Sequence, residues 1–65
     1  MTHEQIEYRK YVLQGMASYD GDVAQALVWC GNHFIKLSNS QRNAINKLSA
    51  KERNQVIHEL TMVFM

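Results

Sequence analysis

Cysteine, histidine and the acidic residues are the side chains of this chain that could act as nucleophiles, general bases or metal ligands. Cys30 is the only cysteine, and His3, His33 and His58 lie 25 or more residues apart. Zinc sites in small domains use pairs of ligands about two to five residues apart, which this spacing does not provide. We therefore predict no catalytic residue, no metal and no cofactor, and we expect the protein not to be an enzyme.

Cys30 lies in a helical pattern of apolar residues, with no adjacent base that the spacing would place beside it. The pattern recurs at three- and four-residue steps, along one side of a helix, and consists of Val23, Leu27, Cys30, Phe34 and Leu37. A cysteine at such a position behaves as a small apolar side chain. A single cysteine also excludes an internal disulfide. The sequence therefore predicts a packing role for Cys30.

Aromatic residues indicate binding rather than catalysis. Tyr8 and Tyr11 stand one turn apart, and Trp29 lies off the apolar pattern of its helix. Tyrosine and tryptophan suit protein interfaces because one part of the side chain is apolar and another makes hydrogen bonds. Core packing is the other interpretation of each of them, and for Trp29 it is the favoured one. With the apolar residues near position 64, the predicted interface residues are Tyr8, Tyr11, Trp29, Val63 and Phe64.

The second half of the chain carries the basic charge. Residues 1–32 contain two basic and four acidic residues, whereas residues 33–65 contain five basic and two acidic ones. Any anionic partner should therefore meet the second half. That half is also rich in serine, asparagine and glutamine, which hydrogen-bond to phosphates and base edges, although a solvated helix face would look the same. Nucleic-acid binding is the alternative function, and its candidate residues are Arg42, Lys47, Lys51 and Arg53.

Helix start signals recur along the chain and predict an all-α fold. Three capping boxes, in which serine or threonine is followed three residues later by glutamine or glutamate, begin at positions 2, 38 and 49. Gly21 ends one helix, and Asp22 caps the next. We predict a compact bundle of three or four helices, over residues 3–19, 23–37, 39–48 and 50–64, in a single domain of residues 1–65. No glycine or proline separates the last two helices, so one bent helix is the alternative.

Apolar positions predict which parts of the helices are buried. The helix over residues 23–37 is apolar on nearly all sides in its first half, which is typical of the most buried helix of a bundle. Leu27, Phe34 and Leu60 stand in the middle of the apolar stripes of their helices. We expect these three residues to belong to the core.

Chain length bears on function through stability. In a chain of 65 residues without a disulfide, a single core rarely supplies more than about 3–5 kcal/mol. Small domains often gain further stability from a partner subunit, which predicts self-association. The sequence has no apolar stretch of membrane-spanning length and no secretory signal at its start. We therefore expect a cytoplasmic regulatory or accessory protein that binds a larger protein, self-associates as a homodimer and does not contact a membrane.

Two known families resemble one segment of the chain, residues 21–34, which reads Gly-Asp-Val-Ala-Gln-Ala-Leu-Val-Trp-Cys-Gly-Asn-His-Phe. Its Gly-Asp-Val start, followed by alanine, tryptophan and histidine, resembles the last helix of ubiquitin-associated domains and of the similar N-terminal module of elongation factor Ts. The segment also resembles the turn of the Fis-type helix-turn-helix, through Gly21, Asp22, Ala24, Ala26, Gly31 and Leu37. Because both families match one segment, the resemblance implies only two packed helices joined at residues 20–22, and neither activity is carried over.

Overall fold

The computed structural model describes residues 1–64, which form four α-helices and one short 3₁₀ helix, η1. Their bounds are His3–Ser18 for α1, Val23–His33 for α2, Phe34–Lys36 for η1, Asn39–Asn46 for α3 and Ala50–Val63 for α4. No strand occurs within these residues, and Met65 lies outside them. The predicted all-α bundle is confirmed, and its last two helices are separate.

The predicted capping boxes start α1, α3 and α4. In each, the side chain of the N-cap residue, which is Thr2, Ser38 or Ser49, accepts a hydrogen bond from the amide three residues later. The side chain of that later residue accepts from the N-cap amide in return. Because an N-cap residue is extended, the chain must leave the helical conformation before it. This requirement separates α3 from α4 at Ser49 without a glycine or proline.

α2 is shorter than the sequence predicted. The α-helix ends at His33, and the chain continues as η1 over Phe34–Lys36 instead of remaining α-helical to residue 37. Leu37 is already extended, and its amide donates to the Phe34 carbonyl at 3.1 Å. The capping box at Ser38 requires an extended backbone there, so the chain tightens into a 3₁₀ turn and then leaves the helix.

A tight turn joins α1 to α2. Asp20 and Gly21 have φ angles of 53° and 82°, and the Gly21 amide donates to the Met16 carbonyl at 2.9 Å. This left-handed pair reverses the chain after α1. Asp22 then caps α2, because its side chain accepts from the Gln25 amide at 3.1 Å. The join predicted at residues 20–22 is confirmed.

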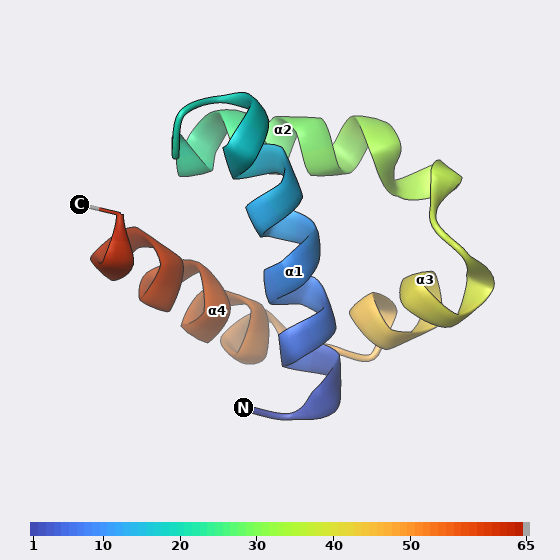
Figure 1. The fold of residues 1–65 in the computed structure, drawn as a ribbon. Helices are drawn as coiled ribbons and strands as arrows, with labels where there is room; N and C mark the ends of the chain where they lie inside the picture. The colour runs from blue at the N-terminus through green and yellow to red at the C-terminus, as the bar shows by residue number, and fades with distance from the viewer. Residues whose placement is uncertain (65) are drawn as a thin grey trace.

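α1 is the central helix, and α2 lies along one side of it. Figure 1 shows α1 crossing the middle of the molecule, where it contacts α2, α3 and α4. The buried residues of α1 are Gln5, Tyr11, Val12, Gly15 and Met16, whereas α2 buries only Ala26 and Cys30. The prediction that the helix over residues 23–37 is the most buried is therefore wrong. α1 covers one side of α2 and α4 adds a smaller contact, so the rest of α2 is exposed.

The core lies where α1 meets the other three helices. Its buried cluster consists of Tyr11, Val12, Met16, Ala26, Cys30, Ile45, Val56 and Leu60. Leu60 is fully buried, as the sequence predicted. Leu27 and Phe34 are only partly buried and pack against the edge of this cluster, which corrects their prediction as core residues. No helix among the described residues is long and apolar enough to cross a membrane.

Candidate functional site

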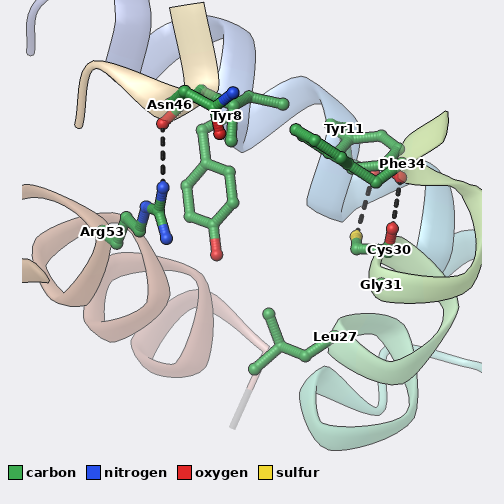
Figure 2. Close-up of a pocket in the computed structure, with 9 residues that line it drawn as sticks. Tyr8, Tyr11, Leu27, Cys30, Gly31, Phe34, Asn46 and Arg53 are labelled. Atoms are coloured by element: carbon green, nitrogen blue, oxygen red, sulfur yellow. Dashed lines mark hydrogen bonds between the residues drawn. The ribbon is translucent and has the colours of Figure 1, made fainter. Parts of the chain in front are cut away.

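A groove of about 300 Å³ opens where all four helices meet. Figure 2 shows its lining residues, which are Tyr8, Tyr11, Leu27, Cys30, Gly31, Phe34, Ile45, Asn46 and Arg53. Most of these side chains are apolar or aromatic, and one carries a positive charge. The groove therefore combines a hydrophobic surface with a small number of placed polar groups, as specific binding sites commonly do.

The spacing of residues along α2 and η1 builds one wall of the groove. Leu27, Gly31 and Phe34 follow one another at four- and three-residue steps, so they share one side of the helix. Gly31 leaves this wall open, because a Cβ atom added there would meet no atom within 4 Å. The wall is thus apolar and accessible along its length.

Tyr11 and Cys30 hold α1 and α2 together beneath this wall. The Tyr11 hydroxyl donates to the Cys30 carbonyl at 2.5 Å, and Cys30 Sγ donates to the Tyr11 carbonyl at 3.9 Å. Burial raises the pKa of the Cys30 thiol to about 11. Burial is also the larger cause, and the neighbouring Cys30 the smaller one, of the raised pKa of Tyr11. Both side chains are therefore neutral at physiological pH, and the Cys30 thiol is not an activated nucleophile.

Arg53 brings a positive charge to the α4 side of the groove. Its Nη2 donates to the Ile45 carbonyl at 3.1 Å, at the C-terminal end of α3, where a cation is favourable. Its Nε is buried and has no hydrogen-bond partner among the described residues. A buried donor without an acceptor costs about 1–3 kcal/mol. An acceptor from a bound partner would remove that cost.

Tyr8 lies between the wall formed by α2 and η1 and the α4 side of the groove. Figure 2 shows its ring projecting from α1 into the groove, between Arg53 and Leu27. Burial and then the nearby Cys30 raise the pKa of Tyr8, while Arg53 lowers it, and the net shift is upward. The hydroxyl is therefore neutral at physiological pH and can donate or accept a hydrogen bond within the groove.

The structure separates the predicted interface residues from one another. Tyr8 and Tyr11 both line the groove, but Tyr11 is buried and also belongs to the core. Trp29 is partly buried and packs on Tyr11 with ring centroids 5.6 Å apart. Val63 and Phe64 are exposed at the end of α4. Only Tyr8 among the five therefore belongs to the groove surface outside the core.

The predicted nucleic-acid residues do not gather at the groove. Lys47 and Lys51 are exposed on either side of the α3–α4 junction, and Arg42 is partly buried, with its Nη2 donating to Asn39 Oδ1. Arg53 alone faces the groove, where it also caps α3. Arg42, Lys47 and Lys51 remain for phosphate contacts.

Sequence reasoning missed the outer face of α2. Ala24, Val28, Gly31 and Ile35 are all exposed, and Val28 and Ile35 expose 62% and 76% of their surface. Ala24, Val28 and Gly31 lie on α2, and Ile35 lies on η1. Their four- and three-residue steps place them in one row that meets the groove wall at Gly31, and we call this row the α2 stripe. Its signal was present in the sequence, because a helix that is apolar on nearly all sides exceeds what three short helices can cover.

Within residues 1–64, no three histidine, cysteine, aspartate or glutamate residues lie close enough together to hold a metal ion. Comparison with known proteins found no matching family model, no matching curated protein and no matching solved structure.

Proposed function

We propose that this protein is a non-catalytic regulatory or accessory module that docks a segment of a larger protein in the groove between its four helices. The observation that carries this proposal is the buried Arg53 Nε, which lacks an acceptor in a groove that is otherwise largely apolar. The apolar walls would bury a large side chain of the partner through the hydrophobic effect. Arg53 and the Tyr8 hydroxyl would fix the orientation of a neighbouring acceptor.

The size of the groove favours a protein segment over a free small molecule. About 300 Å³ is the lower limit of small-molecule pockets, and it accommodates one or two large side chains. A protein segment suits a groove of this size, because one anchor side chain can enter it while the neighbouring residues contact its rim. We expect the anchor to be followed by a carboxylate that reaches Arg53.

Nucleic-acid binding remains the alternative function, supported by the exposed Lys47 and Lys51 in the basic half of the chain. The two functions differ in their dependence on salt. Each phosphate contact releases counterions, which gives a log–log slope of about −0.9 per contact on duplex DNA. Groove binding depends less on salt, because burial of apolar surface is not screened by ions.

We further propose that the protein works in the cytoplasm. Cys30 is free and buried, and the described residues contain no disulfide. Small domains without disulfides are typical of reducing compartments. Cell fractionation of the tagged full chain tests this proposal, and a secreted chain would contradict it.

Affinity copurification from the native host first captures the partner. Titration of that partner with purified variants then tests the docking function. Tyr8→Phe removes the hydroxyl and Arg53→Gln removes the charged guanidinium group, while both leave a side chain of similar length in the groove. Arg53→Gln should weaken binding by at least about tenfold, because a hydrogen bond to a charged group contributes about 1.5–3 kcal/mol. Tyr8→Phe should weaken it less, because its hydroxyl is neutral.

Lys47→Gln and Lys51→Gln are the matched controls, since they remove exposed charges outside the groove. Both should bind the partner as the wild type does, and circular dichroism should show that all four variants are folded. Submicromolar, salt-sensitive binding to random duplex DNA that is lost in the lysine variants would establish the alternative function instead.

A further inference from the structure

We propose that the α2 stripe, Ala24, Val28, Gly31 and Ile35, is the interface of a symmetric homodimer in which α2 of a second copy packs antiparallel against it. An exposed contiguous apolar patch on a small protein marks an interaction surface. The stripe lies beside the groove, but its large side chains are not part of the groove lining. The dimer therefore does not depend on the docking function proposed above.

The α2 stripe is self-complementary in size. In an antiparallel pair centred between Val28 and Gly31, Val28 of each copy faces Gly31 of the other. Ile35 of each copy then faces Ala24 of the other, so each large side chain meets a small residue. A Cβ atom added at Gly31 would meet nothing within 4 Å, so the space that Val28 of the second copy needs is open. This reciprocal arrangement is the one that a twofold axis requires.

The two ends of the stripe are complementary in charge. Asp20 and Asp22 are exposed before α2, and Lys36 is exposed after it. In the antiparallel register, Lys36 of each copy lies near the acidic pair of the other copy, at both ends of the interface. A parallel pair would instead bring like charges together. Charge complementarity of this kind selects the register and orientation of an interface.

The contact between α1 and α2 shows that this chain packs its helices through small residues. A Cβ atom added at Gly15 would lie 3.0 Å from the Ala26 carbonyl oxygen and 3.0 Å from Trp29 Cε3. The two helices therefore approach closely at Gly15 and Ala26. The outer face of α2 also carries two small residues, Ala24 and Gly31, and both are exposed.

The end of α4 is the competing apolar surface. Met62 and Val63 are exposed there, and Phe64 already lies against Gly21 at the α1–α2 turn. The last described turn, residues 60–64, contains no glycine or alanine that would let a second helix approach closely. Size complementarity therefore favours the α2 stripe over this surface.

The area available predicts a weak dimer. A stable interface buries about 800 Å² per partner, which is about a fifth of the 4383 Å² surface of this chain. Three stripe residues on the 11-residue α2 and one on η1 provide less than this. We expect a dissociation constant on the order of 100 micromolar.

Sedimentation equilibrium of the full chain, from about 10 micromolar to about 1 millimolar, tests the dimer. The wild type should pass from monomer to dimer over this range. Val28→Glu and Gly31→Leu should each weaken dimerisation by at least about tenfold. Both positions are exposed, so these variants should keep the helical circular dichroism of the wild type. Lys36→Glu should weaken the dimer by a smaller factor that diminishes at high salt.

Two controls make the test specific to the stripe. Val63→Ser alters the competing surface, and Lys47→Glu makes the same charge change as Lys36→Glu on another helix. Both should dimerise like the wild type, and so should Tyr8→Phe, which alters only the groove. A wild type that is monomeric at about 1 millimolar would overturn the proposal. Loss of the dimer in Val63→Ser with retention in Val28→Glu would overturn it too.

Discussion

The inner and outer faces of α2 have similar composition and opposite surroundings. Ala26 and Cys30 on the inner face are buried against α1, where Gly15 allows close approach. Val28 and Gly31 on the outer face are exposed, although they are also apolar or small. The pattern of the helix alone does not distinguish the two faces. The number and length of the other helices decide which face is covered, and the uncovered face becomes available to a partner.

The largest expected effect comes from the buried side of this comparison. Leu60 is fully buried, so Leu60→Ala should lower the free energy of unfolding by about 2–5 kcal/mol. Leu27→Ala should cost clearly less, because Leu27 is partly exposed and the space it leaves opens to water. Urea unfolding followed by circular dichroism measures both variants. Equal losses would contradict the position of Leu27 in the groove wall.

Gly15→Ala should destabilise the contact between α1 and α2. The added methyl group would lie 3.0 Å from the Ala26 carbonyl oxygen and from the Trp29 ring, which forces the helices apart. We expect the free energy of unfolding to fall by about 1–3 kcal/mol, because the overpacking costs more than alanine gains through its higher helix propensity. In a domain of this size, each kcal/mol lowers the thermal midpoint by about 4–8 °C. A midpoint at or above that of the wild type would show that the two helices are not in close contact.

Gly31→Ala should have the opposite sign, because the same substitution now falls on the open face. No atom lies within 4 Å of the added methyl group, so alanine should stabilise the monomer by about 0.5–1 kcal/mol through helix propensity. Urea unfolding at low micromolar concentration, where the chain is monomeric, measures this gain. A loss of monomer stability would show that another group occupies the space beside Gly31.

Alkaline pH should produce the smallest effect. Burial raises the pKa of the Cys30 thiol to about 11, whereas the pKa of a cysteine in an unfolded chain is about 8.5. The unfolded chain therefore loses this proton first, so the contribution of Cys30 is complete below about pH 8.5 and declines as the pH rises toward 11. Urea midpoints of the wild type should fall more steeply over this range than those of Cys30→Ala. Equal slopes would contradict the burial of the thiol.

The helices were largely predictable because their signals are local. The capping boxes at Thr2, Ser38 and Ser49 start three helices at the predicted positions, and Asp22 starts the fourth. The box at Ser49 also decides between one bent helix and two helices. The end of α2 was less predictable, because it depends on how the chain must turn to meet the next cap.

Burial and the groove were less predictable because they depend on contacts between distant residues. Tyr11 was grouped with interface residues, yet its hydroxyl meets the Cys30 carbonyl inside the core. Arg53 was grouped with phosphate-binding residues, yet it caps α3 and faces the groove. Phe34 was assigned to the core, yet it ends the groove wall. Each of these positions is set by the packing of α1 against the other helices, which helical periodicity does not specify.

Amide spectra of the isotope-labelled full chain, recorded at increasing protein concentration, test most directly whether the open face of α2 is an interaction surface. Between about 10 micromolar and about 1 millimolar, the amides of Ala24, Val28, Gly31 and Ile35 should shift together. The amide of Val63 should stay in place. No concentration-dependent shift, or shifts confined to the end of α4, would contradict this account.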